Sequence, residues 1–295
     1  MFDAQAICAE ISSSTAIPFQ LKNHSSVGGG DINEAYRLVG QCGRVFFVKL
    51  NHASRLEMFV AEAEGLAELA KPKVIRVPTP ICYGTTARHA YLVMEHIEFS
   101  STTNGALMGQ QLAYLHQTDS NGQGHGWHRQ NTIGSTPQIN HWCEDWVGFL
   151  RQHRLGYQLD LAAKKGASGE LVEKGQLLLK GLDFYFESYQ PKPSLLHGDL
   201  WAGNAAFDEG GQPVIYDPAV YYGDRETDIA MTELFGGYSQ EFYAAYEEIW
   251  PLDSGYSSRR DIYKLYHVLN HFNMFGGGYA SQAANILEKL LILLP

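Results

Sequence analysis

The chain contains few cysteines, and none of them form a paired motif. The four cysteines stand at positions 8, 42, 82 and 143, and no two have the C-x-x-C spacing typical of zinc sites and thiol redox enzymes. The sequence therefore does not predict a zinc site or a redox motif. Reduced thiols are the simplest interpretation of these cysteines.

Positive charge is also scarce. Only 22 Lys and Arg residues stand against 32 Asp and Glu residues, which leaves a formal net charge of −10. A negatively charged protein repels the phosphate backbone, so nucleic acid is not an expected partner. No run of Lys or Arg indicates attraction to an anionic membrane surface.

Long apolar runs are missing as well. Residues 1–10 carry an acid at position 3 and lack the basic and apolar stretches of a signal peptide. Residues 286–295 are apolar but short, and they contain two charges, so they do not predict a membrane span. We expect a soluble, cytoplasmic protein with no membrane partner.

The sequence does contain enough apolar residues for a large core. Of its 295 residues, 45% are hydrophobic and 18% are charged, which favours a bilobal unit or two domains over disorder. Residues 44–50 and 90–95 are rich in β-branched and aromatic side chains and predict strands. Residues 54–70 have the apolar spacing of a helix with one buried face. After about residue 98, helical patterns dominate.

These patterns predict an α+β protein with two lobes. We expect a small, β-rich N-terminal lobe over residues 1–97 and a larger, mainly helical C-terminal lobe over residues 98–295. A functional site is expected in the crevice between such lobes.

The most informative segment is 196–204, Leu-His-Gly-Asp-Leu-Trp-Ala-Gly-Asn, which precedes an apolar strand that ends at Asp217. Phosphoryl transfer needs a carboxylate to orient the acceptor hydroxyl and accept its proton, and oxygen ligands for Mg²⁺. Asp199 can serve as that base. Asn204 and Asp217 can serve as the metal ligands, since Mg²⁺ needs few protein oxygens besides those of phosphate. A solvated turn would not explain this spacing, so the motif predicts an ATP- and Mg²⁺-dependent kinase.

A second element is the glycine triplet Gly28, Gly29 and Gly30, followed by Lys49 in the predicted strand 44–50. A glycine triplet alone indicates only a turn. With a strand lysine after it, the loop can cover the phosphates of ATP while Lys49 binds them. It is not a P-loop, because no Gly-Lys-Ser/Thr follows. An edge-strand lysine that reaches water is the alternative interpretation of Lys49.

A lysine flanked by so much apolar sequence needs an acidic partner. Glu62 and Glu64, on the predicted helix 54–70, are the candidates. Glu62 is preferred because its helical spacing places it on the same face as Phe59 and Leu66, which should pack inward.

At this level of detail the chain resembles the fructosamine kinase (ketosamine-3-kinase) family, a branch of the protein-kinase-like fold related to aminoglycoside phosphotransferases and choline kinases. The resemblance runs from near residue 28 to near residue 278. Its most particular stretches are 131–138 (Asn-Thr-Ile-Gly-Ser-Thr-Pro-Gln), 201–204 (Trp-Ala-Gly-Asn) and 221–226 (Tyr-Tyr-Gly-Asp-Arg-Glu). The other matching stretches are 29–33, 46–49, 76–80, 92–95, 196–200, 217–219, 228–231 and 269–271.

The resemblance implies roles for individual residues. Asp199 matches the catalytic base, Asn204 and Asp217 match the Mg²⁺ ligands, and Lys49 matches the phosphate-binding lysine. Residues Met94, Glu95 and His96 match the hinge whose backbone reads adenine. Some members of the family carry a cysteine in the glycine-rich loop. This chain has none there, so thiol control of that loop is not supported.

The resemblance also implies an acceptor, namely a ketoamine that is phosphorylated on its 3-hydroxyl and then loses its amine. Ketoamine small molecules and glycated proteins are both expected partners. Four residues are candidate acceptor contacts: His197, Trp201, Asp224 and Glu226. Trp201 would stack on the sugar, with a core tryptophan as the alternative. Asp224 and Glu226 would attract the protonated amine. Asp228, by contrast, is expected to bond the backbone of the loop that carries Asp199.

Two other functions stay open at this point. An aminoglycoside or choline kinase would share the His-Gly-Asp loop, but it would lack the stretches that correspond to 131–138, 201–204 and 221–226. A nucleotide-binding pseudokinase is the non-enzymatic alternative, and intact residues at all four catalytic positions argue against it. A metal site built on His116, His125, His128, His141 and Cys143 matches no standard spacing.

Overall fold

A computed structural model of the protein describes residues 2–28 and 32–295, and it divides them into two compact units. The first unit comprises the residues up to Thr103 together with Ala206–Asp217. The second comprises Asn104–Ala205 together with Pro218–Pro295. The domain boundary expected near residue 97 stays a prediction.

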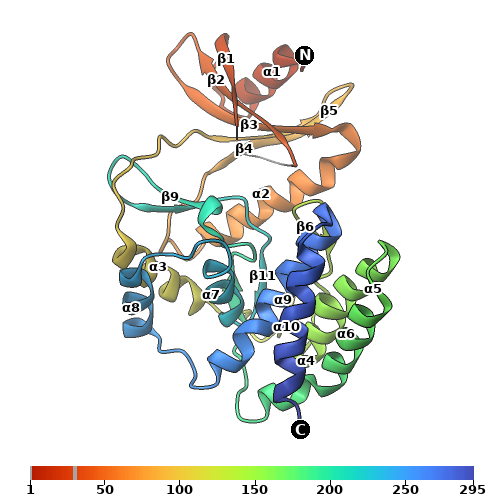
Figure 1. The fold of residues 1–295 in the computed structure, drawn as a ribbon. Helices are drawn as coiled ribbons and strands as arrows, with labels where there is room; N and C mark the ends of the chain where they lie inside the picture. Colours follow the sequence, from red (N-terminus) through yellow and green to blue (C-terminus); the bar gives the residue numbers. More distant parts are fainter. Residues whose placement is uncertain (1, 29–31) are drawn as a thin grey trace. The chain divides into compact units, whose positions relative to one another are not determined.

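The first unit contains a five-stranded antiparallel sheet in the order β1-β2-β3-β5-β4 (Figure 1). Its strands are β1 Leu21–Val27, β2 Glu34–Gly40, β3 Val45–His52, β4 Pro80–Thr85 and β5 His89–Glu95. The strands predicted over 44–50 and 90–95 are confirmed as β3 and β5. The two-residue period of β3 places Phe46, Val48 and Leu50 on one face of the sheet and Lys49 on the other.

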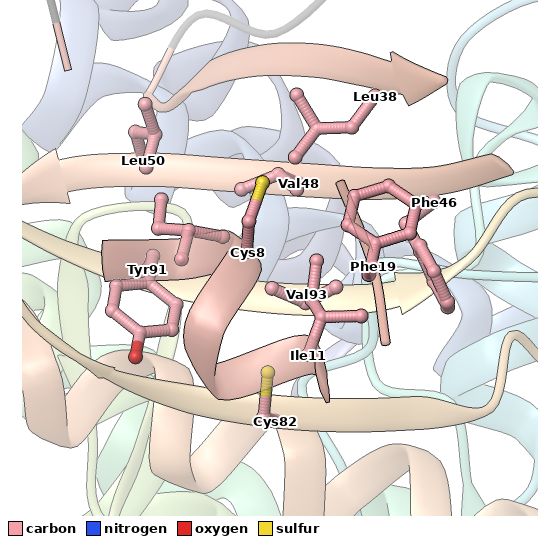
Figure 2. Close-up of a cluster of buried hydrophobic side chains, with 11 residues drawn as sticks. Cys8, Ile11, Phe19, Leu38, Phe46, Val48, Leu50, Cys82, Tyr91 and Val93 are labelled. Carbon is pink, nitrogen blue, oxygen red and sulfur yellow. The ribbon is translucent and has the colours of Figure 1, made fainter. Parts of the chain in front are cut away.

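Helix α1 (Ala4–Thr15) covers the face that carries Phe46, Val48 and Leu50. Asp3 caps this helix by accepting a hydrogen bond from the backbone nitrogen of Ala6 at 3.0 Å. Figure 2 shows the resulting core, in which side chains of α1 lie over those of β2, β3, β4 and β5. The buried members of this core are Ile7, Cys8, Ile11, Phe19, Leu38, Phe46, Val48, Leu50, Cys82, Tyr91 and Val93. All four cysteines of the chain are unbridged.

Helix α2 (Leu56–Ala70), preceded by a single 3₁₀ turn at Ala53–Arg55, contacts β4 and β5. Its apolar spacing was predicted from residues 54–70, and Phe59 and Leu66 are fully buried as expected. Glu62 projects from the same helix. Because α1 covers the opposite face, α2 is the helix whose side chains can reach Lys49.

A hairpin of β9 (Ala205–Phe207) and β10 (Pro213–Ile215) joins the first unit late in the chain. The backbone nitrogen of Ile215 donates to the carbonyl oxygen of Arg76 at 3.0 Å, and that of Ser100 donates to Phe207 at 2.8 Å. These long-range bonds place the strand before Asp217 within the β-rich unit, although the residues on either side of the hairpin belong to the second unit.

The second unit is mainly helical, as predicted. Its α-helices are α3 Gly105–His116, α4 Trp146–Phe149, α5 Tyr157–Lys164, α6 Gly169–Gly181, α7 Glu226–Thr232, α8 Gln240–Ile249, α9 Tyr256–Phe275 and α10 Tyr279–Leu293. A π-helical segment, Leu150–Gly156, joins α4 to α5, and 3₁₀ turns lie at Leu182–Phe186 and Ala202–Asn204. Two short antiparallel pairs complete it: the hairpin of β6 Asn131–Ile133 and β7 Thr136–Gln138, and β8 Ser194–Leu196 with β11 Tyr221–Gly223.

The α+β class is thus confirmed, with the sheet in the first unit and most helices in the second. Within residues 2–28 and 32–295, no helix combines the length and the apolar character needed to span a bilayer.

Helices α3 and α8 pack so closely that a glycine is required between them. A Cβ added to Gly109 would lie 2.1 Å from the carbonyl oxygen of Phe242, a backbone atom that cannot rotate away. We therefore predict that Gly109→Ala lowers the free energy of unfolding by about 1–3 kcal/mol, the usual cost of overpacking a core. Thermal unfolding of the purified variant would show this as a fall in Tm of several degrees.

Gly169→Ala is the matched control, since Gly169 lies in the exposed first turn of α6 and no atom is within 4 Å of the added Cβ. Its Tm should stay equal or rise slightly, because alanine favours helix over glycine. Equal Tm values for the two variants would contradict the predicted close packing.

Candidate active site

The loop that carries Asp199 leaves the short strand β8, which pairs with β11. Gly198 has a φ of +84°, and a Cβ at this position would lie 2.0 Å from the carbonyl oxygen of Ala219. Only glycine tolerates both conditions. The glycine of the His-Gly-Asp motif is therefore required by the path of the backbone.

A buried carboxylate on α7 holds this loop. The Oδ2 atom of Asp228 accepts the backbone N–H of His197 at 2.7 Å, and its Oδ1 atom accepts that of Gly198 at 2.9 Å. Burial acts to raise the pKa of Asp228, but His116 and these N–H groups outweigh it, so the pKa lies below its usual value. The expected bonding of Asp228 to the loop backbone is confirmed.

His116, at the end of α3, supports the same carboxylate. Its Nε2 atom lies 3.2 Å from Oδ2 of Asp228, and its Nδ1 atom lies 2.8 Å from the hydroxyl of Tyr246. The histidine spacing in the sequence matches no standard metal site, and it does not predict the contact of His116 with Asp228. The available signal was its spacing, because His116 follows the fully buried Leu112 by one helical turn.

Within the loop, Asp199 and Asn204 are brought together. The Nδ2 atom of Asn204 donates to the backbone oxygen of Asp199 at 2.9 Å and to its Oδ2 atom at 3.3 Å. The backbone nitrogen of Trp201 also donates to the Asp199 carbonyl, at 3.1 Å. The spacing of five residues thus closes a tight turn with a carboxylate and an amide side by side.

Trp201 lies at the surface of the second unit, with 38% of its area exposed. Its ring covers Gly203, where an added Cβ would lie 2.2 Å from the indole. The rings of Trp201 and Phe235 form a T-shaped pair, with their centres 6.3 Å apart. The alternative of a core tryptophan is therefore wrong. The ring is available for stacking beside the Asp199 loop.

The other predicted acceptor contacts are buried. His197 is fully buried, and its Nδ1 atom accepts the backbone N–H of Asp199 at 3.2 Å. Asp224 accepts hydrogen bonds from the hydroxyls of Tyr263 at 2.5 Å and Tyr189 at 3.0 Å. These contacts tie His197 to the loop and Asp224 to the helical core.

Glu226 forms a paired interaction with Arg259, in which two guanidinium nitrogens each lie 2.8 Å from a carboxylate oxygen. Burial raises the pKa of Glu226 to about 7, against the lowering effect of Arg259. Because Asp224 and Glu226 have no exposed area and are bonded within the helical unit, we assign neither of them to the acceptor.

In the first unit, Lys49 lies between two carboxylates. Its Nζ atom is 2.5 Å from Oε1 of Glu62 on α2 and 2.6 Å from Oδ1 of Asp217. The preferred pairing of Lys49 with Glu62 is therefore present. Burial disfavours the ammonium charge, but Asp217 and Glu62 outweigh burial and raise the pKa of Lys49 above its usual value. Lys49, on β3, is thus a positive charge held in place by Glu62 and by Asp217, the residue that follows β10.

Asp217 follows β10 with a φ of +58°, a left-handed conformation that aspartate tolerates better than most residues. Its side chain is 43% exposed, whereas that of Lys49 is only 7% exposed. Asp217 can therefore bind Lys49 through one oxygen and still present the other to a ligand.

Two of the remaining nucleotide-site candidates, Met94 and Glu95, lie on the same sheet. Met94 and Glu95 end β5, with Met94 buried and Glu95 paired with Arg76 at 3.3 Å. His96 follows them and lies partly buried, 3.5 Å from Glu98. A Cβ on Gly28 would meet no atom within 4 Å. Gly29 and Gly30 lie outside the described residues.

The oxygen donors fit Mg²⁺. Among the described residues, no group of three or more His, Cys, Asp or Glu side chains could hold a metal by itself. Magnesium needs no such cage, because one or two protein oxygens and the phosphates of a nucleotide satisfy it. The exposed carboxylate of Asp217 and the amide oxygen of Asn204 are donors of this kind.

A sequence model of the family described as fructosamine kinase matches residues 3–293. The chain belongs to the fructosamine kinase family. Among its relatives is a protein from Synechocystis named as a probable ketoamine kinase, which is 48% identical over 97% of this chain and 96% of its own. The chloroplastic protein-ribulosamine 3-kinase of Arabidopsis thaliana is 43% identical over 93% of this chain and 84% of its own.

Solved structures support the same assignment. A crystal structure named for fructosamine-3-kinase, from Haemophilus somnus, superposes with a TM-score of 0.89 at 29% identity and covers 97% of this chain and 96% of its own. An aminoglycoside phosphotransferase superposes with a TM-score of 0.64 at 13% identity over 96% of this chain and 98% of its own, which is a likeness of fold alone. The fold is thus kinase-like, and membership of a kinase family implies the use of ATP.

The position of Lys49 generates a prediction about this fructosamine kinase family member. We expect Lys49→Met to lower kcat/KM for ATP by about 10- to 100-fold, the loss expected from one charge-assisted contact to a phosphate. The KM for the acceptor should stay within about twofold of wild type. Steady-state kinetics with each substrate varied in turn would measure both.

Lys22→Met is the matched control, because Lys22 is an exposed lysine on β1 of the same sheet. It should leave both constants unchanged. A defect of Lys49→Met confined to the acceptor KM would show that this lysine does not serve ATP.

Proposed function

We propose that the protein is an ATP-dependent kinase that phosphorylates the 3-hydroxyl of ketoamines, the sugar adducts that form on amines and on protein lysines. The observation that carries this proposal is the 43% identity, over 93% of the chain, to a protein-ribulosamine 3-kinase. The tight loop that joins Asp199 to Asn204 supports it, because phosphoryl transfer needs a carboxylate and an oxygen ligand near each other.

In this proposal Asp199 orients the 3-hydroxyl of the acceptor and accepts its proton. The hydroxyl oxygen then forms a bond to the γ-phosphorus of ATP, and the bond from that phosphorus to the β–γ bridging oxygen breaks, which releases ADP. Asp228 holds the loop backbone so that the Asp199 carboxylate meets the hydroxyl in a fixed orientation.

The same proposal assigns the nucleotide contacts to the residues around Lys49, to the glycine loop and to the end of β5. Lys49 binds the α- and β-phosphates, Glu62 holds the ammonium in place, and the loop of Gly28, Gly29 and Gly30 covers the phosphates. The backbone at Met94, Glu95 and His96 reads the adenine. Asn204 and Asp217 would hold Mg²⁺, which would neutralise negative charge on the phosphates.

On the acceptor side we assign Trp201 alone. Its exposed ring follows the base by two positions and offers a flat apolar surface for the sugar. A cytoplasmic location stays a prediction from composition, and the Arabidopsis relative is chloroplastic by name.

We predict that Asp199→Asn lowers kcat by about 10²- to 10⁴-fold, the contribution typical of a positioned general base. Binding of MgATP should remain, because this carboxylate faces the acceptor. Isothermal titration with a non-hydrolysable ATP analogue would separate the two effects. Asp160→Asn, on the exposed side of α5, is the control and should keep wild-type kcat. More than a tenth of wild-type kcat in Asp199→Asn would refute its assignment as the base.

The central test of the proposed function follows the product. Purified protein, MgATP and a ribulosamine adduct of lysine should yield the ketoamine 3-phosphate. After the enzyme is removed, the product should tautomerise to its 1,2-enaminol and expel phosphate from C3. Hydrolysis of the resulting deoxy-dicarbonyl imine should then free the lysine. Phosphorus NMR and an amino-acid assay would follow inorganic phosphate and lysine over time.

Erythrulosamine and fructosamine adducts, kanamycin and choline complete the acceptor panel. Turnover of kanamycin or choline, with no phosphorylated ketoamine, would replace the proposed function with a different small-molecule kinase. Absence of any metal-dependent turnover across the panel would favour a nucleotide-binding pseudokinase.

A further inference from the structure

The hairpin of β6 and β7 belongs to a stretch, residues 131–138, that distinguishes this family from related kinases, and none of the catalytic roles above is assigned to it. It pairs Asn131 with Gln138, and the side chains of both residues belong to a buried polar network. Gln138 is only 1% exposed, and the neighbouring Asn140 is fully buried. Buried amides of this kind are kept only where each has specific partners.

The partners of Asn131 and Gln138 are backbone carbonyls far away in the sequence. Nε2 of Gln138 donates to the carbonyl oxygen of Ala219 at 2.9 Å, and Nδ2 of Asn131 donates to that of Val220 at 2.8 Å. Ala219 and Val220 are themselves buried. The two amides therefore supply the donors that this stretch of backbone needs away from water.

Ala219 in turn touches the loop that carries the base. Its backbone nitrogen donates to the carbonyl oxygen of His197 at 2.8 Å. Its carbonyl oxygen is the atom that Gln138 binds. A Cβ added to Gly198 would lie only 2.0 Å from this oxygen. Gln138 thus holds an atom that packs against the residue immediately before Asp199.

The Gln138 amide is itself fixed from two sides. The hydroxyl of Tyr266 on α9 donates to its Oε1 atom at 2.7 Å, and its Nε2 atom also donates to Oδ1 of Asn131 at 2.9 Å. The same Asn131 oxygen accepts a hydrogen bond from Nδ2 of Asn140 at 2.8 Å. These bonds leave Gln138 one orientation, with its nitrogen toward Ala219.

Asn140 is oriented by Arg154, a fully buried arginine in the π-helical segment Leu150–Gly156. Nη2 of Arg154 donates to Oδ1 of Asn140 at 2.8 Å, and its guanidinium carbon lies 4.0 Å from the ring centre of Tyr221 on β11. The network therefore runs from the helices, through the β6–β7 hairpin, to the strand that pairs with β8.

We propose that Gln138 and Asn131 are positioning residues for phosphoryl transfer, which act by fixing the backbone at Ala219 and Val220 and, through it, the loop that carries Asp199. This inference rests on the proposed function, because it takes Asp199 as the base. The carboxylate of Asp228 holds one side of the loop by accepting the backbone N–H groups of His197 and Gly198. Ala219 holds the other side, because its backbone nitrogen donates to the carbonyl oxygen of His197 and its own carbonyl packs against Gly198. The loop is thus fixed from two sides, and a small displacement on either side moves the base.

The test uses Gln138→Met, which keeps the length of the side chain and removes its donor and acceptor. We expect kcat to fall about 10- to 100-fold, because a shift of about 1 Å in a catalytic group can lower the rate by about 10²-fold. The KM for ATP should stay within about twofold, since no ATP contact is lost. Single-turnover rates with saturating MgATP and acceptor would show that the loss lies in the chemical step.

Tyr185→Phe is the matched control for a simple loss of stability. The Tyr185 hydroxyl donates to the carbonyl oxygen of Leu290 on α10, so this variant also leaves a buried carbonyl without its donor. It should lower Tm while keeping kcat within twofold of wild type. If Gln138→Met does not fold, Tyr266→Phe takes its place. Tyr266→Phe removes only the donor to Oε1 of Gln138 and should lower kcat about 3- to 10-fold at unchanged KM for ATP.

A fall in kcat for the Gln138 or Tyr266 variant, beside a Tyr185 variant that loses stability and keeps its kcat, supports the proposal. Wild-type kcat in a folded Gln138→Met or Tyr266→Phe variant overturns it, and the network is then structural only. The rates are measured with whichever acceptor of the panel the wild type phosphorylates. Failure of the ketoamine assignment therefore shows in the wild type, whereas failure of the positioning role shows only in the variants.

Discussion

The proposed chemistry depends on one interaction, the hydrogen bonds between the buried carboxylate of Asp228 and the loop that carries Asp199. A carboxylate without water must find donors, and it finds two in the backbone of His197 and Gly198 and a third in His116. Each hydrogen bond to a charged group contributes about 1.5–3 kcal/mol, so the loop is held far more firmly than an exposed turn would be. The glycine at 198 then lets the backbone of Ala219 approach from the other side.

The first unit solves a related problem with a buried cation. Lys49 must lie on the face of β3 opposite the apolar core, because strand side chains alternate. There it would be costly to bury alone, and the carboxylates of Glu62 and Asp217 offset that cost at 2.5 and 2.6 Å. Asp217 is bonded to Lys49 through one oxygen, and its side chain is nevertheless 43% exposed, so the same carboxylate also reaches solvent.

The particular failures of sequence reasoning share a cause. Asp224 and Glu226 look available in the sequence, yet both are buried against tyrosines and Arg259. The spacing of His116 and its neighbours indicates no metal site, but it does not indicate the contact of His116 with Asp228 either. Nothing in the local sequence says which acid faces solvent and which faces a distant helix, because the partners lie between 33 and 112 positions away.

By itself the sequence determined the features that depend on local spacing. The β-branched and aromatic content of residues 44–50 and 90–95 indicated β3 and β5. The helical spacing in 54–70 placed Glu62 on the buried side of α2, and the five-residue spacing brought Asn204 to Asp199. Only the tertiary structure decided the long-range hydrogen bonds. Gln138 meets Ala219 because buried carbonyls need donors, and packing rather than local pattern decides which side chain is near enough to supply one.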